Sequence, residues 1–110
     1  MSSVTSALSD VAASLSPDEL TKKVEEIKAA GNERFLKGDY TQAKALYTDA
    51  LSLNPNIVAI YSNRAICELK LEQYGLAIAD ATKAIELDAT FAKAYYRRAC
   101  AHLALSLIHI

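Results

Sequence analysis

The sequence predicts an all-α fold, an antiparallel helix-turn-helix solenoid of about two and a half repeats that is truncated in the third. The first observation is that the chain matches itself when it is shifted by 34 positions, a period typical of helix-turn-helix repeats. The second is that strong helix start and stop signals recur with the same period. The third is a composition that is 52% hydrophobic and 23% charged with only 3 Gly and 2 Pro, which favours a folded helical domain. The register is carried by two series of residues, Gly31, Ala65 and Ala99, and Ile27, Tyr61 and Tyr95.

Capping signals place five helices along the chain. Ser16-Pro17-Asp18-Glu19 is a capping box with proline at the first helical position, so a helix is predicted over 17–36. Asp39 caps a second helix, which reaches Leu53 before Asn54-Pro55 stops it. Further helices are predicted over 56–70, over 73–87 and from about 90 towards the end.

Small residues predict where the helices of a pair approach each other closely. Gly31 is expected to face Ala43 and Ala50 in the first pair, and Ala65 to face Ala77 and Ala84 in the second. Tyrosines, among them Tyr47, are expected to fill the space around these contacts.

Composition and charge exclude several classes of function. The net charge of −1 gives no basic surface for nucleic acid, and no apolar run approaches the roughly 20 residues that span a bilayer. The leader 1–16 has no Lys or Arg, unlike a secretory or transit signal, so we expect a cytoplasmic protein, with the nucleus also open. Cys67 and Cys100 are interpreted as reduced thiols within helices, with a disulfide as the weaker alternative.

The repeat resembles the tetratricopeptide repeat (TPR) family, through Gly31, Tyr40, Ala43, Tyr47, Ala50 and Pro55. The helix start at Pro17 predicts a flexible leader over 1–16, and the resemblance implies a TPR domain over 17–104, with repeats at 24–57, 58–91 and an incomplete 92–104. Ile27, Ala81 and Ala89 depart from the residues that the family favours at their positions, which does not threaten the fold.

A narrower resemblance is to TPR co-chaperones with a dicarboxylate clamp, which bind the acidic C-terminal tails of Hsp90 and Hsp70. Five residues match that clamp position by position: Lys28, Asn32, Asn63, Lys93 and Arg97. The resemblance implies that these clamp residues bind the carboxylates of a partner's C-terminal peptide, with Lys70 as an auxiliary contact. The spacing agrees, because residues four apart on a helix share a face and stacked repeats align their first helices.

Other polar residues are interpreted as structural and not as part of the binding site. Arg64 and Arg98 are expected to be structural or interhelical, and His102 to pack or meet solvent. A TPR scaffold that binds a partner helix, with the clamp residues incidental, is the alternative function for the groove.

Residues 73–88 and 93–99 look like the N-terminal TPR domains of the serine/threonine protein phosphatase 5 family. The resemblance implies that this chain is the regulatory region of a phosphatase. The two metal ions of that phosphatase would belong to a separate catalytic domain, and that domain would be a further partner of this chain. This chain has two histidines and no ligand cluster, so we expect neither catalysis nor a cofactor in it. Another parent, such as an adaptor, an immunophilin or a ubiquitin ligase co-chaperone, is the alternative.

The C-terminal stretch departs from the repeat. Residues 105–110 match the translation of a common sequencing-library adapter, so we predict that the natural coding sequence ends near Ala104. The alternative is a genuine, unusual helix end. Without a second helix in the third repeat, we expect an exposed apolar edge around Tyr95, Tyr96 and Leu103, a consequence of truncation rather than a binding site.

Overall fold

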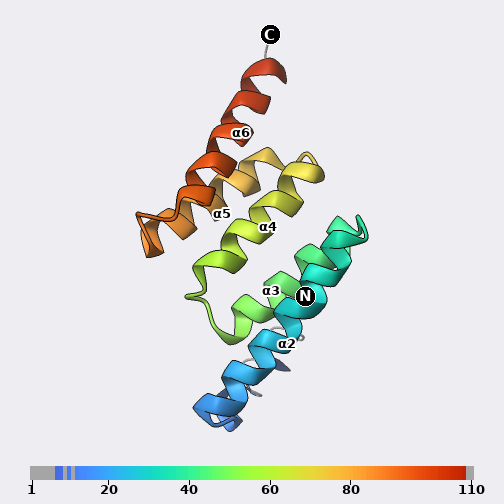
Figure 1. Cartoon of the computed structure of the whole chain (residues 1–110), viewed down its shortest axis with the longest axis vertical. Helices are drawn as coiled ribbons and strands as arrows, with labels where there is room; N and C mark the ends of the chain where they lie inside the picture. The colour runs from blue at the N-terminus through green and yellow to red at the C-terminus, as the bar shows by residue number, and fades with distance from the viewer. Residues whose placement is uncertain (1–6, 9, 11, 109–110) are drawn as a thin grey trace. The chain divides into compact units, whose positions relative to one another are not determined.

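The computed structural model describes residues 7–8, 10 and 12–108, and from Pro17 on it consists of successive helices (Figure 1). Their bounds are α2 (Pro17–Leu36), α3 (Tyr40–Leu53), α4 (Val58–Lys70), α5 (Tyr74–Leu87) and α6 (Ala92–Ile108). The described part contains no strand, which confirms the all-α prediction.

Residues before Pro17 are described only in part. The backbone is helical at 7–8, 10 and 12–14, whereas 1–6, 9 and 11 lie outside the described residues. The flexible leader over 1–16 and the repeat boundaries therefore stay predictions.

The start of α2 is the predicted capping box. Ser16 Oγ accepts a hydrogen bond from the Glu19 N–H at 3.2 Å, and Glu19 Oε1 accepts one from the Ser16 N–H at 3.0 Å. These hydrogen bonds lower the pKa of the Glu19 carboxyl. Asp39 caps α3 in the predicted way, since its Oδ1 accepts from the Gln42 N–H at 3.2 Å.

Both α4 and α6 begin two residues later than predicted, for one shared reason. Asn54 Oδ1 accepts from the Asn56 N–H at 3.1 Å, and Asp88 Oδ1 accepts from the Thr90 N–H at 3.0 Å. Each bond is a local side-chain turn that competes with the helix, so the chain enters α4 at Val58 and α6 at Ala92.

The turns inside the first two repeats also occupy equivalent positions. Gly38 follows α2 with φ of 78°, and Glu72, 34 positions later, follows α4 with φ of 61°. Glycine takes this left-handed conformation freely, but glutamate does so at a cost.

The chain divides into two compact units, of which the first ends at Asn56 and contains α2 and α3. Its core includes Val24, Ala43 and Ala50, together with the buried ring of Tyr47. Gly31 faces that ring, because a Cβ atom at position 31 would lie 2.8 Å from Tyr47 Cε1. The close approach predicted at Gly31 is therefore made to the tyrosine.

The second unit begins at Ile57 and contains α4, α5 and α6. In it α5 packs against both neighbours, as Figure 1 shows, and α4 also contacts α6. Ala65, Ala77 and Ala101 form the centre of the core, where small side chains allow close helix packing.

The structure also bears on the predictions about the cysteines, a membrane span and the C-terminal residues. Cys67 is buried and Cys100 half-buried, and neither forms a disulfide. No helix of the described residues is long and apolar enough to cross a membrane. The helix α6 continues through Leu105 to Ile108, while the adapter origin of 105–110 stays a prediction, with 109–110 outside the described residues.

Candidate peptide-carboxylate site

In the first unit, two predicted clamp residues lie one turn apart on α2. The Lys28 side chain is partly exposed, and its Nζ lies 3.8 Å from Glu25 Oε1, a loose surface ion pair that a stronger anion could replace. Asn32 is half-buried, and its Oδ1 accepts a hydrogen bond from the Tyr47 hydroxyl at 2.5 Å. A cation and an amide are thus presented on neighbouring turns.

Tyr47 is the residue that the sequence analysis missed in this unit. It was assigned to core packing alone, yet its hydroxyl from α3 fixes the amide oxygen of Asn32 on α2. Because this hydrogen bond uses the amide oxygen, it leaves the NH₂ of Asn32 as a donor for a partner. The Gly31 contact lets the ring lie against α2, so the glycine and the tyrosine together orient Asn32.

In the second unit, the other three clamp residues lie on α4 and α6, which contact each other. Asn63 is half-buried on α4, and Lys93 is exposed near the start of α6. Arg97 lies one turn further along α6, with its guanidinium carbon 5.2 Å from the centroid of the Tyr96 ring. Its Nε is buried without a hydrogen-bond partner. A buried, unpaired donor is costly, which favours recruitment of an acceptor at this point.

Ser62, next to Asn63, is a second residue that the sequence analysis missed. It stands 34 positions after Lys28, so it holds the same register position in the second repeat. The serine is 1% exposed, and its Oγ has no hydrogen-bond partner. The hydroxyl can donate or accept a hydrogen bond. Ser62 and Asn63 together therefore give this turn of α4 two polar side chains that could bind a partner.

The charge around these residues favours anions. Between Ala92 and Ile108, α6 carries Lys93, Arg97 and Arg98 and no acid. The auxiliary residue Lys70 is exposed in the last turn of α4. A partner's carboxylate near the start of α6 would therefore lie close to cations of α6.

Arg64 and Arg98 are interhelical, as predicted. Arg64 Nε donates to Asp80 Oδ2 at 2.7 Å, and its NH2 donates to Asp80 Oδ1 at 2.6 Å, which joins α4 to α5. These hydrogen bonds raise the pKa of the Arg64 guanidinium. Arg98 NH1 donates to Thr82 Oγ1 at 3.4 Å, from α6 to α5.

Metal-ligating residues do not gather in the described part of the chain, where no group of three or more His, Cys, Asp or Glu could hold an ion. His102 is exposed on α6, as expected, and His109 lies outside the described residues. The expectation that this chain binds no cofactor stays a prediction.

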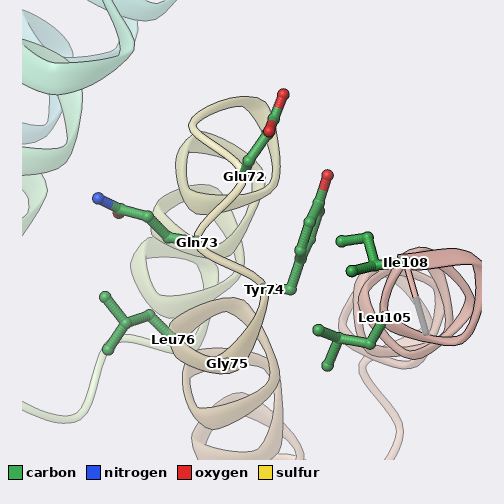
Figure 2. Close-up of a pocket in the computed structure, with 7 residues that line it drawn as sticks. All are labelled: Glu72, Gln73, Tyr74, Gly75, Leu76, Leu105 and Ile108. Atoms are coloured by element: carbon green, nitrogen blue, oxygen red, sulfur yellow. The ribbon is translucent and has the colours of Figure 1, made fainter.

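A separate hollow of about 750 Å³ lies at the other end of α6 (Figure 2). Leu105 and Ile108 of α6 form one wall, and Tyr74 at the start of α5 faces them. None of the clamp residues lines this hollow, so it is distinct from the candidate site.

Comparison with known proteins agrees with the observed repeats. The sequence model of the tetratricopeptide repeat matches residues 29–57 and 58–91. Serine/threonine-protein phosphatase 5 from Homo sapiens is 44% identical over 88 residues, which are 80% of this chain and 18% of that protein. Sperm-associated antigen 1 from Mus musculus is 47% identical over 72 residues, 66% of this chain and 8% of that protein. The chain thus spans less than a fifth of these relatives.

Solved structures with the same fold include complexes with peptides. The TPR2AB domain of yeast Sti1 in complex with an Hsp90 peptide has a TM-score of 0.78 and 36% identity, over 93% of this chain and 37% of that one. The first TPR domain of Spaghetti (RPAP3), bound to the Hsp90 peptide SRMEEVD, has a TM-score of 0.76 and 31% identity, over 80% and 70%. The second TPR domain of human RPAP3, with the Hsp70 peptide SGPTIEEVD, has a TM-score of 0.76 and 31% identity, over 82% and 75%.

Proposed function

Since the chain belongs to the tetratricopeptide repeat family, we propose that it is a protein-interaction module for the acidic C-terminal tails of Hsp90- and Hsp70-type chaperones. The proposed ligands of the tail are Lys28, Asn32, Asn63, Lys93 and Arg97, with Lys70 as an auxiliary contact to upstream acids. The observation that carries this proposal is the paired presentation of a cation and an oriented amide on α2, combined with cations and no acid on α6.

The chemistry of the tail matches these donors. The peptides in the two RPAP3 complexes both end in Glu-Glu-Val-Asp, so each terminal residue carries a side-chain carboxylate and the chain-end carboxylate. Two adjacent carboxylates need several donors on rigid elements, and charge-assisted hydrogen bonds contribute about 1.5–3 kcal/mol each. Five donors on helices are enough for recognition of a short tail.

The proposed ligands include both neutral and charged donors. Asn32, with its oxygen held by Tyr47, offers a neutral NH₂, and Lys28 adds charge beside it. Arg97 has a buried Nε in need of an acceptor, and Lys93 adds an exposed ammonium one turn away. We propose that the neutral and charged donors divide the two carboxylates between them.

The parent protein in this proposal is a phosphatase 5-like enzyme, for which this chain would be the regulatory N-terminal part. The 44% identity with the human phosphatase supports that parent, and the catalytic domain with its two metal ions would lie outside this chain. In the same proposal the protein acts in the cytoplasm, with the nucleus also open, and its own phosphatase domain is a second partner.

A different co-chaperone parent is the second candidate. The 47% identity with Sperm-associated antigen 1 shows that a similar repeat region also occurs in a protein with another name and a much longer chain. The proposed tail binding would be shared by both parents, so a full-length transcript separates them without changing the function of this chain.

A titration of the chain with a peptide that ends in Met-Glu-Glu-Val-Asp tests the proposal. We expect saturable binding that weakens as salt is raised, because exposed cations contribute part of the attraction. The same peptide with an amidated C-terminus should bind about tenfold or more weakly, the loss of one charge-assisted contact. Equal affinity for both peptides would exclude a carboxylate clamp.

Two variants serve as controls in that titration. Lys70→Ala should weaken the free-acid and the amidated peptides by the same factor, since Lys70 is proposed to contact upstream acids. Lys83→Ala on α5, also exposed, should leave both affinities unchanged. If Lys83→Ala weakened binding as much as Lys70→Ala, the binding would be explained by general charge attraction.

A further inference from the structure

The buried hydroxyl of Ser62 on α4 is unfavourable in the folded chain by itself. The side chain is 1% exposed, and its Oγ has no hydrogen-bond partner among the described residues. A buried hydroxyl without a partner has lost its hydrogen bonds to water, and serine is also a poorer helix former than alanine. Alanine would avoid both costs, so the serine points to a hydrogen bond that forms only in another state of the molecule.

Arg97 on α6 carries the complementary unpaired group. Its Nε is also buried without a hydrogen-bond partner, and the Nε–H can only donate. The guanidinium carbon lies 5.2 Å from the centroid of the Tyr96 ring, which is itself 62% exposed. Among the described residues no ion pair or hydrogen bond holds this guanidinium, so it can move towards an anion without breaking one.

The packing of α4 against α6 brings Ser62 and Arg97 to the same level of the second unit. Ala65 of α4 and Ala101 of α6 belong to one buried cluster. Ser62 lies one turn before Ala65 on the same face of α4, and Arg97 lies one turn before its own alanine on α6. The two helices contact each other and run in the same direction (Figure 1), so both residues lie at the same end of this contact.

We propose that Ser62 is a positioning residue for Arg97: when a carboxylate is bound, the Ser62 hydroxyl accepts a hydrogen bond from the Arg97 Nε–H. The two NH₂ groups of the guanidinium then face the carboxylate, which they bind through parallel hydrogen bonds. One hydrogen bond satisfies both buried groups, and it holds the guanidinium in the orientation that the tail needs. This role rests on the proposed function, in which Arg97 is a ligand of the tail, and adds a residue outside the five clamp positions.

The ¹H–¹⁵N resonance of the Arg97 Nε–H tests this contact directly. In the ¹⁵N-labelled full chain it is assigned by its absence from Arg97→Lys, and the probe is a peptide that ends in Met-Glu-Glu-Val-Asp. At saturation the Nε–H should exchange with water about tenfold more slowly than in the free chain, as expected for one new charge-assisted hydrogen bond. In peptide-saturated Ser62→Ala this slowing should be absent. Slowing that persists would mean that the carboxylate itself binds Nε, and would overturn the proposal.

Ser62→Ala should also change binding and stability in opposite directions. The affinity for the free-acid peptide should fall about fivefold to tenfold, because Arg97 is no longer held towards the carboxylate. The Tm of the free chain should stay the same or rise, because an unpaired buried hydroxyl is removed. A serine with only a structural role would give the reverse pattern, a lower Tm with an unchanged affinity.

Ser52→Ala on α3 is the matched control. The Ser52 hydroxyl donates to the Thr48 carbonyl oxygen at 3.1 Å within its own helix, so its loss should leave the affinity and the Arg97 resonance unchanged. No binding to the unaltered chain, or equal affinity for the free-acid and amidated peptides, would overturn the proposed function and this role together. A preference for the free acid that is combined with an unchanged affinity in Ser62→Ala would overturn the role of Ser62 alone.

Discussion

The guanidinium of Arg64 on α4 meets the carboxylate of Asp80 on α5 edge to edge, through hydrogen bonds of 2.7 Å and 2.6 Å. Both side chains are largely shielded from solvent, so the ion pair joins α4 to α5 in a defined geometry within the second unit. It lies where the sequence suggested only an interhelical arginine.

Removal of one partner should be much worse than removal of both. Asp80→Ala is expected to lower the free energy of unfolding by about 3 kcal/mol, because it leaves Arg64 shielded from water without its acceptor. The double variant Arg64→Leu with Asp80→Leu should be less destabilised than Asp80→Ala alone. Urea denaturation measures both.

The control for this pair is on the surface of the first unit. Lys37 and Glu33 form an ion pair at 3.1 Å with both side chains exposed, so Glu33→Ala should change stability by less than about 1 kcal/mol. If Asp80→Ala lowers the free energy of unfolding no more than Glu33→Ala does, the stabilising role of the Arg64–Asp80 pair is wrong.

Two glycines in helices should respond in opposite directions to the same substitution. A Cβ at Gly31 would lie 2.8 Å from Tyr47 Cε1, so Gly31→Ala should destabilise by about 1–2 kcal/mol through overpacking. Gly75 has no atom within 4 Å of the equivalent point, so Gly75→Ala should stabilise by about 0.5–1 kcal/mol through helix propensity. Thermal unfolding of the two variants gives the signs, and stabilisation by Gly31→Ala would contradict the contact.

The hydroxyl of Tyr47 should matter more for binding than for folding. Tyr47→Phe keeps the buried ring and removes the hydrogen bond to Asn32, so stability should fall by about 1 kcal/mol. The affinity for a Glu-Glu-Val-Asp peptide should fall severalfold, because the Asn32 amide is no longer held in one orientation. Calorimetry with Tyr40→Phe as a matched control measures this, and an unchanged affinity would remove Tyr47 from the site.

The left-handed turn after α4 offers a stabilising substitution. Glu72 has φ of 61°, the conformation that Gly38 takes in the first repeat. Glu72→Gly should therefore raise the free energy of unfolding by about 0.5–1 kcal/mol, because glycine has no Cβ strain there. Glu26→Gly, at an exposed position in the helical interior of α2, should lower it instead. Chemical denaturation compares them, and a loss of stability in Glu72→Gly would show that its side chain holds the turn.

The local elements could be predicted from the sequence because their causes are local. Ser16 and Asp39 cap their helices through residues three positions away, and the spacing of 34 fixed the order of the repeats. The starts of α4 and α6 were predicted too early, since Asn54 and Asp88 bend the chain through bonds to residues two positions ahead.

The helix positions of the proposed ligands could be predicted from the sequence, but not the contacts that support them. The register predicted that Lys28 and Asn32 share one helix face and that Lys93 and Arg97 share another, and these pairs lie on α2 and α6. The Tyr47 contact joins residues 15 positions apart on two helices, and the Asp80 contact joins residues 16 apart, so neither follows from spacing along one helix. Buried, unpaired atoms on Ser62 and Arg97 likewise arise only from tertiary packing.

In the proposed function, Asn32 and Arg97 are both ligands of the terminal carboxylates of a bound tail. The test is the ratio of Kd values for the amidated and free-acid peptides, taken in the unaltered chain, in Asn32→Ala and in Arg97→Ala. We predict a ratio of about ten or more in the unaltered chain that falls towards one in both variants. A ratio that is unchanged in either variant would mean that the substituted residue does not contact the terminal carboxylates, and the proposed set of ligands would be wrong.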